Sequence, residues 1–332
     1  MSSAAGPIEG RSVIGVDLGG TKILARWVDP TTGASTGRVK ARTPKTGVAD
    51  VVDALLAVIG EIDPDAAAPA IGVGVPGPVN DAGVVERCPN IVGWDEPLDL
   101  ATILETRLGR PVVVGNDVNC GAVGEHRLGA GRGHADLLAV FVGTGVGGGL
   151  VLDGALRAGT RGLAGEIGHV TVGTEGRPCG CGGVDHLETY AGKAGIEREA
   201  RRRAAAGERS VLIDLAGDSA IKSRHLAKAL EEQCPVTTEL LEGAITALAR
   251  VIGNTATLLD VGCVVLGGGI VDKLGQPLVD EIVGHPEFGG FGPNTTLVTL
   301  GHRLDDAGVV GAAALAADRA SGGAAVGLAG GS

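Results

Sequence analysis

The chain has 332 residues, of which 59 are glycine and only three are Phe, one is Tyr and two are Trp. A chain of this length usually needs more than one hydrophobic core, and here the cores must be built from Val, Leu, Ile and Ala. The net charge of −11 argues against a nucleic-acid-binding surface, and the absence of a leader-like start or a long apolar run predicts a cytoplasmic protein that does not enter a membrane.

Strand-like and helical segments alternate between flexible tails expected at 1–11 and 320–332, which is typical of an α/β fold. The glycines after the first strand are expected to form a hairpin turn, because a second strand follows them directly. The first half is predicted to contain, in chain order, strands 12–17 and 23–29, helix 48–62, strand 70–75, helix 98–108, strand 111–115 and helix 118–126.

The pattern then repeats, with a second strand–glycine turn–strand hairpin near the start of the second half. Two such hairpins predict two lobes of similar design, one formed by 12–119 with the last helix packed back on it and one formed by 120–306. The basic run Arg198–Arg203 is interspersed with Glu, so it is interpreted as the solvated face of a helix. The predicted elements are strand 137–142, return strand 150–152, a mostly helical insertion 189–233, helix 238–259, strand 263–266 and helix 307–319.

Three glycine turns each follow an apolar strand. Glycine lets backbone N–H groups converge on an anion, a Thr hydroxyl adds a donor, and a neighbouring Asp can hold the Mg²⁺ that accompanies ATP. A tight hairpin is the alternative for any one turn, but three together indicate a nucleotide site, in which the third would approach the adenine or ribose. The turns are Asp17-Leu18-Gly19-Gly20-Thr21-Lys22, Gly143-Thr144-Gly145-Val146-Gly147-Gly148-Gly149 and Gly267-Gly268-Gly269.

Asn116 and Asp117 follow a strand of β-branched residues. A carboxylate at such a strand end can accept the proton of an attacking hydroxyl. The alternative is that Asp117 caps the helix that follows, as Asp often does. The two roles can coexist, so the sequence leaves both open.

Taken in order, these motifs resemble those of the ROK family, which comprises repressors, open-reading-frame proteins and sugar kinases of the actin/hexokinase/Hsp70 superfamily. The resemblance covers about 12–319 and implies a two-lobed actin-like ATPase (ribonuclease H-like) fold with a cleft between the lobes. Besides the three glycine turns, it is carried by Val75-Pro76-Gly77-Pro78-Val79, Asn90-Ile91-Val92-Gly93-Trp94, Asn116-Asp117-Val118-Asn119 and Gly165-Glu166-Ile167-Gly168-His169.

The resemblance implies ATP-dependent phosphorylation of a hexose, with glucose first among the acceptors and Asp117 as the general base. Phosphoryl transfer needs mainly alignment and charge neutralisation, so turns, Mg²⁺ and one carboxylate are sufficient. The residues implied to hold the sugar are Gly77, Asn90, Asn116, Asp117, Glu166, His169 and Glu188. Those implied to hold the nucleotide are Asp17, Gly19, Gly20, Thr21, Lys22, Thr144, Gly145, Gly267 and Gly268.

A zinc motif of the family pairs the His169 position with three downstream cysteines, but here only Cys179 and Cys181 are cysteines and the third position is His186. Two Cys and two His can still complete a closed, tetrahedral structural zinc site that orders the Gly-rich loop around them. The alternative is two free thiols and an ordinary surface histidine. The other four cysteines, which are expected to be buried small apolar residues, are Cys88, Cys120, Cys234 and Cys263.

The sequence also bears on functions other than a glucokinase. A repressor of the same family needs a helix-turn-helix domain before the first glycine turn, and only about a dozen residues precede that turn. A non-catalytic sugar-binding protein is disfavoured because Asp117 and the turns are intact. An N-acetylhexosamine kinase, a fructokinase and a donor such as polyphosphate remain open, and the resemblance implies a dimer or tetramer.

Overall fold

The computed structural model describes residues 12–289, 296–302 and 306–322. The tail expected at 1–11, and the tail expected at 320–332 from residue 323 onward, lie outside the described residues. The described residues form two compact units, one within 1–135, 149–164 and 305–332 and the other within 136–148 and 165–304. Within the described ranges, no helix is both long and apolar enough to cross a membrane.

The first unit is built on a five-stranded mixed sheet with the strand order β3-β2-β1-β4-β7. β1 (Val13–Leu18) pairs antiparallel with β2 (Lys22–Val28), which in turn pairs antiparallel with β3 (Ser35–Arg42), a strand that the sequence analysis did not predict. β1 pairs parallel with β4 (Ile71–Val75), and β4 pairs parallel with β7 (Val112–Asn116). The carboxyl ends of β1, β4 and β7 therefore lie along the same edge of this sheet.

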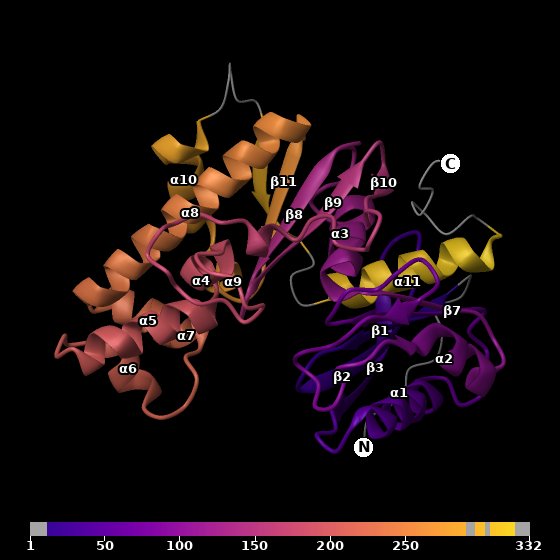
Figure 1. Ribbon diagram of the computed structural model, residues 1–332. Coiled ribbons are helices and arrows are strands. Elements are labelled where there is room, and N and C mark those ends of the chain that lie inside the picture. Colours follow the sequence, from indigo (N-terminus) through magenta and orange to yellow (C-terminus); the bar gives the residue numbers. More distant parts are fainter. Residues whose placement is uncertain (1–11, 290–295, 303–305, 323–332) are drawn as a thin grey trace. The chain divides into compact units, whose positions relative to one another are not determined.

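Two helices, α1 (Val48–Ile62) and α2 (Leu100–Leu108), cover one face of this sheet (Figure 1). α1 forms as predicted because its apolar residues recur every three or four positions and make one continuous face. Each fully buried Val, Leu or Ile contributes about 1.5–3 kcal/mol to folding. The buried residues of α1 are Val51, Val52, Leu55, Val58, Ile59 and Ile62.

The opposite face of the sheet is covered by the C-terminal helix α11 (Ala307–Ala320), which packs against α3 (Asp117–Leu128) and on β1 and β4. Glycines allow this approach. A Cβ on Gly311 would lie only 1.6 Å from the carbonyl oxygen of Cys120, and one on Gly72 would lie 1.9 Å from that of Ala312. α11 therefore rests on the backbone of its neighbours.

A second five-stranded sheet has the order β10-β9-β8-β11-β12. β11 (Cys263–Gly267) pairs parallel with both β8 (Leu137–Val142) and β12 (Leu297–Leu300). β9 (Val146–Leu152) pairs antiparallel with the short β10 (Ala155–Leu156). The prediction that the return strand begins at residue 150 is wrong: β9 begins at Val146, so the turn is limited to 143–145.

The glycines at the start of β9 are strand residues because another chain segment passes close to them. A Cβ on Gly148 would lie 2.4 Å from the carbonyl oxygen of Gly165. Glycine inside a strand often marks such a close backbone approach. The glycine run 143–149 therefore combines a three-residue turn with a packing requirement.

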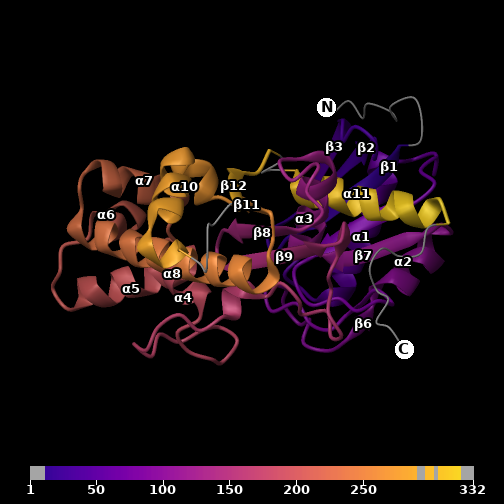
Figure 2. The ribbon, with the colours of Figure 1, turned by 90° about the horizontal axis from the view of Figure 1, so that it is seen from above.

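Helices make up most of the rest of the second unit. The longest is α8 (Pro235–Leu259), which begins with proline at its first position and packs against α4 and α10 (Figure 2). The insertion predicted at 189–233 is mostly helical, as expected. The remaining helices are α4 (Leu187–Ala191), α5 (Lys193–Ala205), α6 (Val211–Ala216), α7 (Ser223–Glu231), α9 (Val271–Leu274) and α10 (Gln276–Gly284).

Two smaller expectations are also confirmed. The basic run lies on α5, where Arg201 pairs with Glu197 and Arg202 pairs with Glu199 along the helix surface. The four cysteines outside the metal motif are buried, namely Cys88, Cys120, Cys234 and Cys263. They are packing residues of the two units.

Candidate functional site

In the first unit, the predicted site segments gather at one edge of the sheet. The turn 19–21 follows β1, Gly77 follows β4, and Asn116 and Asp117 stand at the junction of β7 and α3. Because β1, β4 and β7 are parallel neighbours, these segments lie side by side at the carboxyl ends of the strands, which is where open α/β sheets bind ligands.

The first glycine turn is held from two sides. The Gly19 amide donates to the carbonyl of Lys22 at 2.8 Å, which closes the turn. Thr43, which follows β3, donates from its hydroxyl to the carbonyl of Gly19 at 2.6 Å, and its amide donates to the carbonyl of Thr21 at 3.2 Å. On the other side, a Cβ on Gly20 would lie 2.9 Å from the carbonyl oxygen of Asn90. The turn is therefore a fixed structure.

Asp17 is the last polar residue of β1 before this turn, and its side chain is half-buried. Burial raises the pKa of the Asp17 carboxyl, the positive charge of Lys22 opposes that effect, and the nearby Asp306 adds to it. A carboxylate oxygen in this position is the type of ligand that Mg²⁺ prefers in proteins.

At the start of α3, capping falls to Asn116, so the alternative in which Asp117 caps the helix is wrong. The Asn116 Oδ1 accepts a hydrogen bond from the Asn119 amide at 3.0 Å, and its Nδ2 donates to the carbonyl of Gly77 at 3.1 Å. Asp117 is the first helical residue, and its Oδ1 accepts from the Val118 amide at 2.8 Å. The positive end of the helix dipole therefore lies beside the Asp117 carboxyl group.

In the second unit, two glycine turns are neighbours. β8 ends at the turn 143–145 and β11 ends at Gly267, which lies opposite Phe141 in the parallel pair. Gly268 has a φ of 88°, and a Cβ there would lie 2.7 Å from the backbone N and O of Val142. Glycine is therefore required for conformation and for space.

Lys193, which the sequence analysis missed, lies beside both of these turns. Its amide donates to the carbonyl of Gly143 at 3.1 Å, and the Ala194 amide donates to that of Thr144 at 3.0 Å. The Lys193 Nζ lies 3.7 Å from the position that a Cβ on Gly269 would take. An ammonium group next to two glycine turns adds positive charge of the kind that an anionic ligand requires.

The second unit also brings Glu166, His169 and Glu188 together. The Glu166 Oε2 lies 3.9 Å from the His169 Nε2, and a Cβ on Gly145 would lie 2.2 Å from the Glu188 Oε2. Burial raises the pKa of Glu166, His169 opposes the shift, and Glu188 adds to it. Two carboxyl groups and an imidazole supply the donors and acceptors that match sugar hydroxyls.

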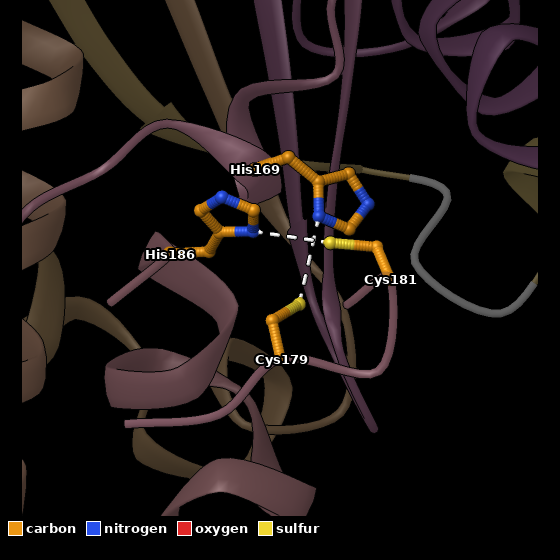
Figure 3. A group of neighbouring side chains, drawn as sticks. All are labelled: His169, Cys179, Cys181 and His186. Carbon is orange, nitrogen blue, oxygen red and sulfur yellow. Dashed lines mark hydrogen bonds between the residues drawn. The ribbon is translucent and has the colours of Figure 1, made fainter. Parts of the chain in front are cut away.

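The four residues predicted to bind a metal form one cluster, in which the side chains point toward one another (Figure 3). Their ligand atoms all lie within 4.8 Å of one another. The Cys179 Sγ lies 3.7 Å from the His169 Nδ1, and the Cys181 Sγ lies 3.3 Å from the His186 Nδ1. The structure therefore places the His186 imidazole beside the other three side chains, where a fourth metal ligand in place of the third cysteine must lie.

This donor set fits zinc. Bond lengths of 2.0–2.3 Å in a tetrahedral site separate neighbouring ligand atoms by about 3.3–3.8 Å, and thiolate with imidazole is a typical zinc environment. The loop that carries the ligands is tightly folded, since the Cys179 amide donates to the carbonyl of Gly183 at 2.8 Å. In the metal-free protein the Cys179 thiol donates to the Glu188 Oε1 at 3.2 Å.

The chain is similar to known proteins over nearly its whole length. A family model described as the ROK family matches residues 13–319. A glucokinase of Streptomyces coelicolor is 36% identical over 81% of this chain and 85% of that protein. An N-acetyl-D-glucosamine kinase of Pasteurella multocida is 32% identical over 91% of this chain and 98% of that protein.

One solved structure adds a ligand-bound relative. A ROK family glucokinase from Streptomyces griseus, in complex with glucose and AMPPNP, is 36% identical and superposes with a TM-score of 0.78 over 92% of this chain and 99% of that chain. The likeness confirms the expected fold, in which two mixed five-stranded sheets correspond to the actin-like ATPase architecture.

Proposed function

Because this chain belongs to the ROK family and is an ATP-dependent sugar kinase, we propose that its acceptor is glucose and its product glucose 6-phosphate. The observation that carries the proposal is the greater identity to a glucokinase than to the N-acetyl-D-glucosamine kinase. The glucose-bound relative supports the same assignment.

We assign the general base to Asp117. The acceptor hydroxyl becomes a better nucleophile as its proton passes to a carboxylate within hydrogen-bond reach. The helix that Asn116 caps fixes the backbone of Asp117, and the hydrogen bond from the Val118 amide orients one carboxylate oxygen. These contacts support the assignment because a base must be held in position before the substrate arrives.

The remaining sugar contacts are assigned by chemistry. In the first unit they are the carbonyl of Gly77 and the amide side chains of Asn90 and Asn116. In the second unit they are Glu166, His169 and Glu188. The hydroxyls of a hexose both donate and accept, and amides, carboxylates and imidazole complement them.

The ATP phosphates are assigned to the glycine turns. The turn 19–21 with Thr21 and Lys22 supplies backbone and side-chain donors, and Asp17 would hold the Mg²⁺ that neutralises phosphate charge. The second unit would add Thr144 and Gly145, with Gly267 and Gly268 beside the adenosine. With charge neutralised, the turns need only align the terminal phosphate with the acceptor oxygen.

The metal cluster would hold a structural zinc ion, because four protein ligands leave no open position. His169 turns its Nδ1 toward Cys179 and its Nε2 toward Glu166. A ligand shell that also orients Glu166 would keep one sugar contact in place.

An N-acetylhexosamine kinase is the second candidate, because the Pasteurella multocida relative is named as a kinase of that class. The two candidates differ at the sugar 2-position, where the amino sugar carries an acetamido group. An enzyme selective for glucose would lose activity on the bulkier substituent, and an amino-sugar kinase would leave its pocket partly empty with glucose.

The decisive experiment is a coupled assay of purified protein with glucose, N-acetylglucosamine, N-acetylmannosamine and fructose, each with ATP and with polyphosphate. We expect the highest kcat/KM with glucose and ATP. A higher value with either N-acetylhexosamine would reject glucose as the preferred acceptor, and a higher value with fructose would do the same.

Asp117→Asn tests the base. It keeps the shape of the side chain and removes its basicity, so kcat is expected to fall by about 10² to 10⁴-fold. Glucose binding, followed by calorimetry, should change little because a binding contact of similar geometry is kept. Asp53→Asn, on the exposed surface of α1, is the matched control. Full turnover in Asp117→Asn would remove Asp117 as the base.

A further inference from the structure

Asp185, the residue before the metal ligand His186, combines two properties that each carry a cost. Its φ is 55°, in the left-handed region that most residues other than glycine avoid. Its carboxyl group is buried, since the residue is only 3% exposed. A buried carboxylate and a backbone in this region both lower stability unless other contacts compensate. The contacts of Asp185 show what it is held there to do.

The Asp185 carboxylate accepts three hydrogen bonds. The Gly176 amide donates to its Oδ2 at 2.7 Å, and the Arg177 amide donates to its Oδ1 at 3.0 Å. The Tyr190 hydroxyl donates to Oδ1 at 2.8 Å. The two amides precede the metal-binding cysteines in the chain, whereas the tyrosine lies on α4, after His186. One side chain therefore joins the two ends of the loop that carries the cysteines.

The backbone of Asp185 is held between two neighbouring segments. Its amide donates to the carbonyl of Arg177 at 2.8 Å, and its carbonyl accepts from the Val172 amide at 2.8 Å. The first contact reaches the segment that leads to Cys179, and the second reaches the segment that follows His169. Three of the four ligands drawn in Figure 3 are therefore attached to segments that Asp185 connects.

The tyrosine of this network is itself fixed by packing. A Cβ on Gly173 would lie 2.0 Å from the Tyr190 hydroxyl oxygen, so the glycine leaves the room that the hydroxyl needs. The guanidinium carbon of Arg177 lies 4.0 Å from the centre of the Tyr190 ring, which is a cation–π contact. The donor to Asp185 is therefore held in place by more than its hydrogen bond.

We propose that Asp185 is a positioning residue of the metal site: it fixes the base of the loop, whereas the metal fixes the tip at 179–183. A segment that must be ordered on binding weakens affinity, and a segment that is ordered beforehand avoids that loss. Carboxylates behind the ligands of a metal site act in this way, by orienting the groups that ligate. The proposal rests on the proposed zinc site and goes beyond it by naming a further side chain that sets the affinity.

A purely structural role leads to a different expectation. If Asp185 only stabilised the fold, its loss would lower the free energy of unfolding and leave the metal affinity of the folded protein unchanged. A positioning residue changes that affinity, because without it the base of the loop must be ordered at the moment of binding. Metal affinity is therefore the quantity that separates the two roles.

The test is titration of metal-stripped, full-length protein with Co²⁺, followed by its absorption spectrum, and with Zn²⁺ in competition with a chromophoric chelator. Asp185→Asn keeps the shape of the side chain but replaces one acceptor oxygen with a donor. Asp185→Gly removes the carboxylate and also relieves the left-handed backbone. Tyr190→Phe removes a single donor. Asp260, which is exposed after α8 and has a φ of 52°, receives the same Asn and Gly substitutions as the matched control.

We expect Asp185→Asn and Asp185→Gly to bind each metal about 10- to 100-fold more weakly than the parent protein. Tyr190→Phe should weaken binding by a smaller factor, and the Asp260 variants should bind as the parent does. At saturation, all Co²⁺ spectra should match that of the parent, because the four ligands are still present. Weaker binding by Asp185→Gly would show that the carboxylate matters even when the backbone is relieved.

Parent-like metal affinity in either Asp185 variant would overturn the proposal. Equal weakening in the Asp260 variants would also overturn it, as would a changed Co²⁺ spectrum at saturation. If circular dichroism shows that the Asp185 variants do not fold, Tyr190→Phe decides, and parent-like affinity in that variant overturns the proposal. A parent protein that binds neither metal would overturn the zinc assignment as well. The titrations need no turnover, so their outcome is distinct from that of the kinase proposal.

Discussion

At Thr43, a single hydroxyl group helps to fix the first glycine turn. Thr43→Val keeps the shape of the side chain and removes the 2.6 Å hydrogen bond to the carbonyl of Gly19. A hydrogen bond of this kind is worth about 0.5–1.5 kcal/mol. We therefore expect kcat/KM for ATP to fall by up to about tenfold, with the KM for glucose little changed and Thr43→Ser close to the parent. Steady-state kinetics with ATP and glucose varied in turn measure this effect. Equal changes in the KM for ATP and the KM for glucose would contradict it.

Asp63, at the end of α1, makes stability depend on acid pH. Its side chain is 2% exposed and accepts hydrogen bonds from the Ala67 and Ala68 amides and from the Arg110 guanidinium. Burial raises the pKa of this carboxyl, but together these donors lower the pKa by more than burial raises it. The pKa of Asp63 therefore lies below its ordinary value. The contribution of Asp63 is therefore present above about pH 4, the unfolded-state value, and is lost as the pH falls through the folded-state pKa.

Asp63→Asn is expected to lower the free energy of unfolding at pH 7 by about 3 kcal/mol, because it leaves the Arg110 charge without its partner. The difference between the variant and the parent should shrink in strong acid, where the parent carboxylate is also neutral. Urea unfolding across the pH range checks this. A difference that stayed constant with pH would show that charge is not the cause.

The residues next to the glycine turns could be predicted because strand, turn and anion-binding donors are local in sequence. The role of Thr43 could not be predicted, because it depends on β3 returning beside the turn. The role of Lys193 could not be predicted either, because Lys193 reaches the turns only through the position of α5. Asn116 and Asp117 show an intermediate case: the sequence places a polar pair at a helix start, but only the hydrogen bonds of Asn116 decide which residue is the cap.

Helix α11 is seated by glycine, so a single methyl group should disturb it. Gly311→Ala would place a Cβ 1.6 Å from the Cys120 carbonyl oxygen and must push α11 away from α3. Overpacking of this kind costs about 1–3 kcal/mol, and more where backbone must move. Gly243→Ala, in α8 with nothing near its Cβ, is the control and should stabilise by up to about 1 kcal/mol. Thermal unfolding of both variants measures the contrast, and equal effects would contradict this account of packing.

The Gly-rich loop between Val170 and His186 should depend on metal for its order. We expect purified protein to contain about one zinc ion per chain, because the four ligands form a single site. Cys181→Ser should lose most of it, whereas Cys234→Ser, which changes a buried cysteine at the start of α8, should keep it. Metal analysis gives the ratio, and Co²⁺ spectra would report two thiolate ligands. Only a trace of zinc in the parent protein would refute the site.

Most elements could be predicted from apolar periodicity, and the exceptions have physical causes. β3 was missed because it is an edge strand with one residue, Val39, buried, and its Arg and Lys residues face outward. The start of β9 was missed because glycine normally signals a turn. There, Gly148 serves close packing against Gly165, which lies well beyond it in the chain.

At the scale of the whole chain, the two strand–glycine turn–strand hairpins lead to similar units. Each holds the central parallel strands of a mixed five-stranded sheet, and each carries its glycine turns at the carboxyl ends of those strands. The repeated pattern is visible in the sequence because both hairpins keep an apolar strand before the glycines. The helices that distinguish the second unit, α4–α8, can be predicted as helical from the sequence. Their packing cannot, because it depends on contacts that no local pattern encodes.

The position of α11 has a consequence for biosynthesis. The ribosome makes β1 and β2 long before α11, yet Val13, Leu24 and Val28 are covered by Val309, Val310 and Ala313 of that helix. This sheet therefore keeps one apolar face open until α11 has left the exit tunnel. The usual order, in which the first-made part of a nascent chain folds first, is therefore not open to this sheet, and its uncovered apolar face is a site of aggregation until α11 is made.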